Sequence, residues 1–325
     1  MYKEKILNLL RASPREFLSG EDLANKTGIS RTMVWKHIKS LERDGFRIEA
    51  VPSQGYRILS TPDILRQNDI KQGIKTRIIG KKIHLFPSIS STNTLAMEMA
   101  SKGAPEGTVV IAETQTDGKG RLGRTWTSPP GNLYLSVVMR PSVPLYKAPL
   151  ITLMGAVAVA SVIGEICRIK ADIKWPNDIL ISGKKVSGLL TEMSAEQDRI
   201  RHIVLGIGID VNMDLEVLPC EIRAHTTTLA TETGEKLNRT SFLQELLRAI
   251  EHWYRVFLND PGDVIKEWKK LNMTLGNRIM VHGAGEAIEG KAQSIDSEGR
   301  LIIRQDDGIT RTIAAGDITI IKWDK

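Results

Sequence analysis

The first forty-five residues alternate apolar and polar positions with the period of an α-helix. This pattern predicts a first helix over residues 3–10. Ser19 is placed to cap a second helix, and Ser30 to cap a third helix that ends near Gly45. In the third helix apolar side chains form one stripe, while basic side chains lie mostly on the other side. That arrangement is typical of a DNA-recognition helix.

The stretch after the third helix, FRIEAVPSQGYRIL, indicates two short alternating strands around a turn. A β-hairpin in this position forms the wing of a winged helix, so residues 1–62 are predicted to be a winged helix-turn-helix domain that binds DNA. A small helical domain used for protein contacts is the alternative. The candidate DNA contacts are polar residues of the third helix and the hairpin, namely Arg31, Thr32, Lys36, Lys39, Arg47 and Arg57.

After a polar connector over residues 63–81, strands and helices follow one another with short links. Strands joined by such short links are antiparallel neighbours. We therefore predict an α+β domain over residues 82–272, with a mixed or antiparallel sheet and helices. Residues 273–325 show short strands separated by Gly, Asp and Ser turns, which predicts a small SH3-like β-barrel.

The run from Ala148 to Gly164 is the most apolar part of the chain. It is shorter than the roughly 20 residues that a membrane span needs, so we expect a buried helix. The N-terminus is amphipathic rather than a signal peptide, and Cys167 and Cys220 have neither disulfide nor metal spacing. We expect a cytoplasmic protein with no membrane partner and no dedicated metal site. The net charge of +7 fits an anionic partner such as nucleic acid.

The stretch DGKGRLGRTW, residues 117–126, matches the G-x-G-x-x-G pattern of a dinucleotide-binding turn. In that motif a helix follows the third glycine and holds the pyrophosphate at its N-terminus. Here a Pro-Pro-Gly turn and a strand follow Gly123, which argues against a nicotinamide-dependent oxidoreductase, and the Walker A spacing is absent as well. A loop so rich in glycine and cations is predicted to be a mobile clamp for an anion.

Five segments carry a family resemblance, and they occur in the order SSTN, GKGRLGRTW, KWPNDI, KVSGLL and GIGIDVN. With the winged helix in front of them, they resemble the bacterial biotin protein ligases that also repress the biotin operon. The resemblance implies that ATP, with Mg²⁺, activates biotin to biotinyl-5′-adenylate (biotinyl-5′-AMP). Biotin would then pass to a lysine of the biotin carboxyl carrier protein of acetyl-CoA carboxylase or of another biotin-accepting protein. It also implies that the adenylate is a corepressor that favours a homodimer on operator DNA.

The resemblance implies a role for individual side chains. Arg121 and Lys185 would be catalytic. Arg121 would contact the adenylate and hold it, and Lys185 would stabilise the reacting carboxyl and phosphate oxygens. Asp178 would orient the acceptor lysine or assist the metal. The residues implied to bind biotin or its adenylate are Ser91, Thr92, Asn93, Gln115, Gly118, Lys119, Gly120, Arg121, Lys185 and Gly188. Those implied to contact ATP or adenine are Arg124, Trp126, Asn177 and Asn212. A ligand-sensing regulator without ligase activity and a lipoate or octanoate ligase are the alternatives.

Overall fold

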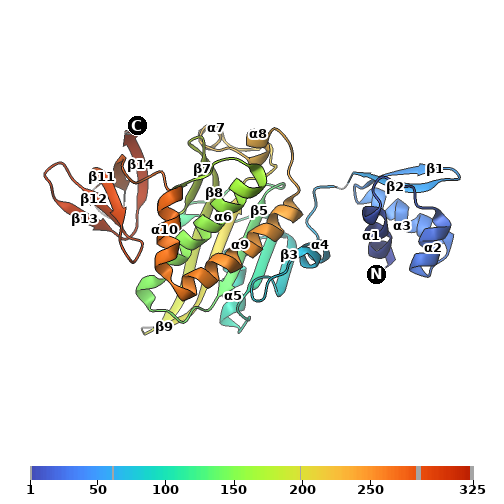
Figure 1. Ribbon diagram of the computed structural model, residues 1–325, viewed down its shortest axis with the longest axis horizontal. Coiled ribbons are helices and arrows are strands. Elements are labelled where there is room, and N and C mark those ends of the chain that lie inside the picture. The colour runs from blue at the N-terminus through green and yellow to red at the C-terminus, as the bar shows by residue number, and fades with distance from the viewer. Residues whose placement is uncertain (1, 61, 198, 283–286, 323–325) are drawn as a thin grey trace. The chain divides into compact units, whose positions relative to one another are not determined.

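A computed structural model describes residues 2–60, 62–197, 199–282 and 287–322. The chain divides into two compact units, Met1–Ile64 and Leu65–Lys325. The first unit contains three helices and a β-hairpin, and the second is built on a large sheet with helices and ends in a small β-sheet (Figure 1).

The first unit has the winged-helix fold that the sequence predicts. Its elements are α1 (Tyr2–Ala12), α2 (Gly20–Thr27), α3 (Arg31–Arg43), β1 (Arg47–Val51) and β2 (Gly55–Ser60). Ser19 Oγ accepts a hydrogen bond from Asp22 N at 3.0 Å, and Ser30 Oγ accepts one from Met33 N at 3.3 Å. These two caps satisfy amide groups that would otherwise lack partners at the helix starts. The strands β1 and β2 pair antiparallel.

The second unit is organised around a seven-stranded sheet with the order β3-β4-β5-β9-β8-β7-β6. The strands are β3 (Lys82–Ile89), β4 (Thr108–Gln115), β5 (Leu133–Met139), β6 (Asp172–Lys174), β7 (Asp178–Ile181), β8 (Lys184–Glu196) and β9 (Arg199–Ile209). β3 and β4 run parallel, while the other neighbouring pairs run antiparallel. The predicted mixed sheet is therefore confirmed.

Helices cover both faces of this sheet. They are α4 (Gln67–Gly73), α5 (Thr92–Ser101), α6 (Leu150–Cys167), α7 (Cys220–Arg223), α8 (Leu229–Thr233), α9 (Arg239–Asn259) and α10 (Pro261–Leu271). Successive side chains of a strand point to opposite faces. Accordingly, Val109 and Ile111 of β4 belong to the core under α6, α9 and α10, whereas Val110 between them packs with α5. The face that carries α5 also carries the candidate site.

Helix α6 is the hydrophobic centre of the second unit. The segment Leu145–Cys167 is long and apolar enough to cross a membrane, but most of it is buried inside the fold. It lies between the sheet and the helices α9 and α10 (Figure 1). The prediction of a buried helix is confirmed.

The segment that the sequence assigns to a connector is folded onto the second unit. Leu65 and Ile70 are buried in its main core, and α4 packs against α9. Glu251 of α9 accepts hydrogen bonds from the backbone N–H groups of residues 77–79, at 2.6–2.9 Å. Only the short stretch around residue 64 therefore separates the two units along the chain.

The last part of the chain forms a five-stranded antiparallel sheet. Its strands are β10 (Arg278–His282), β11 (Ile288–Ile295), β12 (Leu301–Arg304), β13 (Thr310–Ile313) and β14 (Asp317–Lys322), in the order β13-β12-β11-β10-β14. Its apolar side chains, including Ile279 and Leu301, join the same core as α6. Trp175 Nε1 also donates a hydrogen bond to Gly299 O at 2.9 Å, which ties this sheet to β6 and β7.

Candidate active site

One pocket on the α5 face of the large sheet gathers most of the predicted site residues. It is lined by Ser91, Thr92, Asn93, Gln115, Lys119, Gly120, Arg121, Arg124, Trp126, Asn177, Asp178, Lys185 and Gly188. These residues come from the start of α5, the end of β4, the glycine-rich loop and the β7–β8 hairpin. Four segments that are distant in sequence thus meet at a single site.

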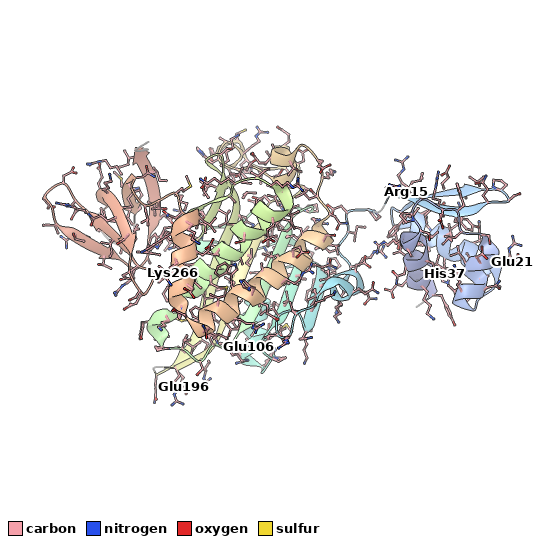
Figure 2. All side chains as sticks on the ribbon, in the orientation of Figure 1. Arg15, Glu21, His37, Glu106, Glu196 and Lys266 are labelled. Atoms are coloured by element: carbon pink, nitrogen blue, oxygen red, sulfur yellow. The ribbon has the colours of Figure 1, made fainter. Side chains whose placement is uncertain are left out.

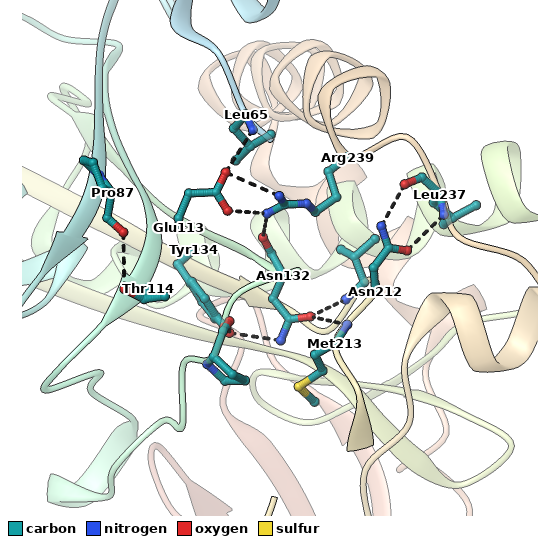
Figure 3. A network of polar contacts seen from close by, with 12 residues as sticks. Leu65, Pro87, Glu113, Thr114, Asn132, Tyr134, Asn212, Met213, Leu237 and Arg239 are labelled. Atoms are coloured by element: carbon teal, nitrogen blue, oxygen red, sulfur yellow. Dashed lines mark hydrogen bonds and ion pairs between the residues drawn. The ribbon is translucent and has the colours of Figure 1, made fainter. Parts of the chain in front are cut away.

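Two predicted residues lie elsewhere. Asn212 Nδ2 donates to Leu237 O at 2.8 Å, and Asn212 Oδ1 accepts from Leu237 N at 2.9 Å (Figure 3). The amide of Asn212 thereby holds the chain ahead of α9, so its position does not support the predicted ATP contact. At Gly118 a Cβ atom would lie 2.3 Å from Trp126 O. This glycine lets the loop fold back on itself rather than lining the pocket.

The start of α5 forms the neutral polar end of the pocket. Ser91 caps the helix by accepting a hydrogen bond from Thr94 N at 3.4 Å. Gln115 Oε1 accepts from Thr92 N at 2.8 Å and from Thr92 Oγ1 at 3.1 Å, while Gln115 Nε2 donates to Ser128 Oγ at 2.9 Å. The orientation of the Gln115 amide is therefore fixed by partners on both of its ends.

Asn93 is the most tightly held side chain at this end. Its Oδ1 accepts from Ser136 Oγ at 2.6 Å, and its Nδ2 donates to Glu192 Oε2 at 2.8 Å and to Leu190 O at 3.2 Å. Neither Ser136 nor Glu192 is among the residues predicted from the sequence. Both lie on strands that reach Asn93 only in the folded sheet, so no local pattern marks them.

Three glycines form a flat floor for the pocket. At Gly206 a Cβ would lie 2.1 Å from Asn93 Oδ1, and at Gly208 it would lie 2.7 Å from Trp126 Nε1. At Gly188 a Cβ would lie 2.9 Å from the Trp126 ring. The indole therefore rests directly on backbone, and any larger residue here would displace it. In GIGIDVN the glycines at alternate positions contribute to the site, and their period of two was the available signal.

Acidic and basic side chains meet at the other end of the pocket. Lys185 Nζ lies 2.6 Å from Asp178 Oδ1 and 5.1 Å from the centre of the Trp126 ring. The backbone of Lys185 is held as well, because Lys185 N donates to His225 O at 2.8 Å and Lys185 O accepts from Thr227 N at 2.9 Å. This lysine is thus positioned by its backbone and by its charge.

The glycine-rich loop is held by the C-terminal sheet. Arg121 Nη1 donates to Asn177 Oδ1 at 3.0 Å and to Gly316 O at 3.2 Å, and it lies 3.6 Å from Asp317 Oδ1. Arg124 forms an ion pair with the same Asp317. Burial lowers the pKa of Arg121, whereas Asp317 and then Asp178 act in the opposite direction. No sequence motif marks Asp317, because it lies in a separate sheet far along the chain.

Lys174 is a further cation of this cluster that sequence reasoning left without a role. It is half-buried at the end of β6, and burial lowers the pKa of its ammonium group. Asp178 and Asp317 oppose that shift, while Lys185 and Arg124 add to it. Four cations and two carboxylates are therefore close enough to influence one another at this end of the pocket.

Replacing Asp317 with asparagine is expected to loosen the glycine-rich loop of the ligand-free protein. The change removes the negative charge that pairs with Arg124 and lies beside Arg121. Limited trypsin digestion should then cut the loop several-fold faster than in the original protein. Asp307→Asn, in the turn between β12 and β13, is the control. Equal digestion rates for all three proteins would refute the role of Asp317.

A buried acid lies at the end of β9, next to the floor of the pocket. Asp210 Oδ1 accepts a hydrogen bond from Asn132 Nδ2 at 2.9 Å, and the residue is only 4% exposed. Burial raises the pKa of Asp210 to about 8, although Lys185 acts against this shift. The folded protein therefore holds this proton at a pH where the unfolded chain has released it.

Asp210→Asn is expected to flatten the dependence of stability on pH. Between the unfolded pKa of 3.8 and the folded pKa of about 8, stability falls with rising pH because the unfolded chain releases the proton first. The slope from one such group is at most about 1.4 kcal/mol per pH unit. The variant should gain more in thermal unfolding midpoint at pH 8 than at pH 5. An equal change at both pH values would contradict the assignment.

The first unit presents a separate hollow between its helices and its hairpin. The lining residues include Glu21 (Figure 2), Arg31, Thr32, Trp35 and the hairpin turn. Two of the predicted DNA contacts already have partners inside the unit. Arg57 pairs with Glu49 at 2.6 Å and stacks on Phe17 at 4.5 Å, and Lys39 pairs with Glu42 at 2.8 Å. The others, Lys36 and Arg47 included, are exposed.

Comparison with known families agrees with the division of the chain into a winged-helix unit, a large central sheet and a small C-terminal sheet. Residues 3–57 match the HTH domain model, residues 85–210 match the biotin/lipoate A/B protein ligase family, and residues 274–320 match the biotin protein ligase C terminal domain. The bifunctional ligase/repressor BirA of Bacillus subtilis is 40% identical over 96% of this chain and 97% of its own length. The protein of the same name from Escherichia coli is 30% identical over 95% of each chain.

Solved structures lead to the same family. The biotin protein ligase from Aquifex aeolicus, solved in complex with biotin and ATP, matches with a TM-score of 0.64 and 30% identity. The match covers 75% of this chain and all of that protein. The matching family models, the relatives that align over nearly the full length of this chain, and the similar solved structure all agree. This chain therefore belongs to the family of bifunctional biotin protein ligases and repressors.

Proposed function

We propose that this chain activates biotin with ATP to form biotinyl-5′-adenylate and pyrophosphate, and then transfers biotin to a lysine of a carrier protein. The observation that carries the proposal is one pocket with a neutral amide end, at Asn93 and Gln115, and a cationic end, at Arg121 and Lys185. Biotin has the same two ends, a neutral ureido ring and a carboxylate. Family membership supports the assignment.

The activation step brings two anions together, because the biotin carboxylate must attack the α-phosphate of ATP. Lys185 and Arg121 supply positive charge at the end of the pocket where this would occur, and Asp178 keeps Lys185 oriented. Preorganised charge of this kind stabilises a transition state without later reorganisation. The fixed amides of Asn93 and Gln115 would receive the ureido group, which needs neutral donors and acceptors.

Magnesium fits the site as a companion of the ATP phosphates. Among the described residues, no three His, Cys, Asp or Glu side chains gather into a metal cluster. The Asp178 carboxylate lies at the cationic end of the pocket, and Mg²⁺ usually takes one or two protein oxygens beside phosphate and water. When bound there, the ion would neutralise negative charge on the phosphates.

The glycine-rich loop would close over the adenylate once it has formed. A mixed anhydride hydrolyses in water, so a cover of Trp126 and the loop cations would preserve it until an acceptor arrives. Asp178 is placed to orient the incoming lysine. The acceptor is the biotin carboxyl carrier protein of acetyl-CoA carboxylase or another biotin-accepting protein, and the reaction takes place in the cytoplasm.

The second part of the proposal concerns repression. The adenylate would act as corepressor by favouring a homodimer, whose two winged units grip a palindromic operator. A dimer with twofold symmetry matches a DNA site with twofold symmetry, and the spacing of the two half-sites follows from the geometry of the dimer. Acceptor proteins that consume the adenylate would relieve repression.

Mass spectrometry of the small molecules tests the ligase assignment. The protein is incubated with ATP, Mg²⁺ and, in parallel, biotin, lipoate or octanoate, with Arg121→Ala as the control variant. A biotinyl-adenylate that depends on Arg121 is the expected product. An adduct formed only with lipoate or octanoate would place the chemistry on another substrate. Failure with every acid would favour a regulator that only senses its ligand.

Lys36→Ala is expected to weaken DNA binding about tenfold and to lower the salt dependence of binding by about one counterion. Lys36 is exposed on α3, one turn beyond Thr32, where a side chain can reach a phosphate. The probe is a duplex that the protein, with biotin and ATP, selects from a random pool. Lys5→Ala, on α1, should have little effect, and equal losses for both variants would mean that net charge alone matters.

A further inference from the structure

A buried ion pair joins the two ends of the glycine-rich loop. Arg239, at the start of α9, is only 2% exposed. Its Nη1 donates to Glu113 Oε2 at 2.8 Å and to Asn132 O at 2.7 Å, and its Nη2 donates to Glu113 Oε1 at 3.3 Å (Figure 3). One guanidinium therefore bridges two strands at the same level of the sheet.

The two residues that Arg239 bridges are the stems of that loop. Glu113 lies on β4 two positions before Gln115, which lines the neutral end of the pocket. Asn132 directly precedes β5, and residues 116–131 between them contain the glycine-rich segment. The side chain of Asn132 is fixed in turn, because its Oδ1 accepts from Val211 N at 2.8 Å. Movement of either stem would strain the contacts of Arg239.

The same carboxylate also holds the chain where it enters the second unit. Glu113 Oε1 accepts a hydrogen bond from Leu65 N at 2.9 Å. Leu65 is the first residue of the second unit, and the residues before it lead from the wing of the first unit. A single carboxylate is thus shared between the loop stem and the linker to the DNA-binding unit (Figure 3).

We propose that Glu113 and Arg239 form a positioning pair that couples closure of the glycine-rich loop to the linker of the winged unit. The inference rests on the proposed function, because it explains how adenylate at one site changes DNA binding at another. Neither residue touches the pocket, so neither acts on the reacting atoms. The pair transmits the position of the loop stems to Leu65.

Physical considerations favour a coupled response at this junction. A buried guanidinium that loses one of its partners is left with an uncompensated charge, which is strongly destabilising. Arg239 therefore resists independent motion of Glu113 and Asn132. A stem that shifts when the loop orders will carry the shared carboxylate with it. Coupling between two sites is reciprocal, so operator DNA should in turn slow release of the adenylate.

The experiment compares Arg239→Lys and Glu113→Gln with a matched control, Glu251→Gln. Glu251 also lies on α9 and also holds backbone amides of the entering chain, but its hydrogen bonds go to residues 77–79 and not to the loop stems. For each full-length protein, affinity for the selected duplex is measured with and without biotin, ATP and Mg²⁺. The release rate of the adenylate is measured with and without the duplex.

In the original protein and in Glu251→Gln, biotin and ATP should raise DNA affinity by about tenfold or more. In Arg239→Lys and Glu113→Gln this gain should fall below about threefold, and the duplex should no longer slow adenylate release. Full coupling in both variants would overturn the proposal. A gain lost equally in Glu251→Gln would also overturn it, because any loosening of the linker would then suffice. No gain in the original protein would instead refute the corepressor function.

Hydrogen exchange on the original protein gives a second test that needs no variant. The Leu65 amide donates directly to Glu113, so biotin with ATP should slow its exchange together with that of residues 113–116. Protection that appears in the loop but leaves the Leu65 amide unchanged would overturn the proposal, even if the variants fail to fold.

Discussion

Replacing Lys185 with methionine should lower the rate of adenylate formation by about 100- to 1,000-fold, the usual loss when one preorganised charge is removed from a transition state. Methionine keeps the length of the side chain and its packing beside Trp126, but it carries no charge. Asp178 would then face the α-phosphate without its partner at 2.6 Å, so repulsion would add to the loss. The effect should appear mainly in kcat.

Lys184→Met is the matched control for this experiment. Lys184 is the neighbouring residue in the β7–β8 hairpin, but its side chain is exposed and does not line the pocket. Pyrophosphate release measured at saturating biotin and ATP distinguishes the two variants. If Lys185→Met kept its rate within about fivefold of the original, the charge would not be acting on the transition state, and the catalytic assignment would fail.

A substitution in the glycine floor of the pocket is expected to have the second large effect, a loss of biotin affinity. Gly206→Ala would place a methyl group 2.1 Å from Asn93 Oδ1 and push that amide from its contacts with Ser136, Leu190 and Glu192. A site built on oriented amides loses affinity steeply when those amides are displaced, because the buried polar groups lose their partners. We expect biotin to bind about 100-fold more weakly, with a smaller change for ATP.

Isothermal titration with biotin alone provides the measurement. Gly164→Ala, in helix α6, is the control, since a Cβ there meets no atom within 4 Å and alanine favours a helix. A loss of biotin affinity in Gly206→Ala without any change in thermal stability would fit local displacement of Asn93. Unchanged affinity would show that Asn93 moves freely and does not orient the ligand.

Local signals made most of the fold predictable. Ser19 and Ser30 cap helices because each hydroxyl accepts a hydrogen bond from a backbone amide three residues further along. Such a cap is visible in the sequence because it involves no distant residue. Helix α10 is not among the predicted elements, although Val264 and Trp268 are four positions apart and both buried. A proline stands at the start of this helix, where its missing N–H costs nothing because the first amides of a helix have no partner within it.

The candidate site was less predictable, because much of it depends on contacts across the sheet. The resemblance implies an ATP or adenine contact for Asn212, yet its amide is bound to Leu237, and the glycines of that motif form the pocket floor. Asp317 has no local motif at all. It meets Arg121 and Arg124 only because the C-terminal sheet folds against the loop.

The position of Trp126 makes the fluorescence of this residue sensitive to what binds in the pocket. Its indole rests on Gly188 and Gly208, beside the Lys185 ammonium group, and within the described structure its buried Nε1–H has no hydrogen-bond acceptor. An indole is a donor only, so an arriving ligand oxygen would change both its hydrogen bonding and its local polarity. Emission from this residue should therefore report occupancy of the pocket in real time, without any attached dye.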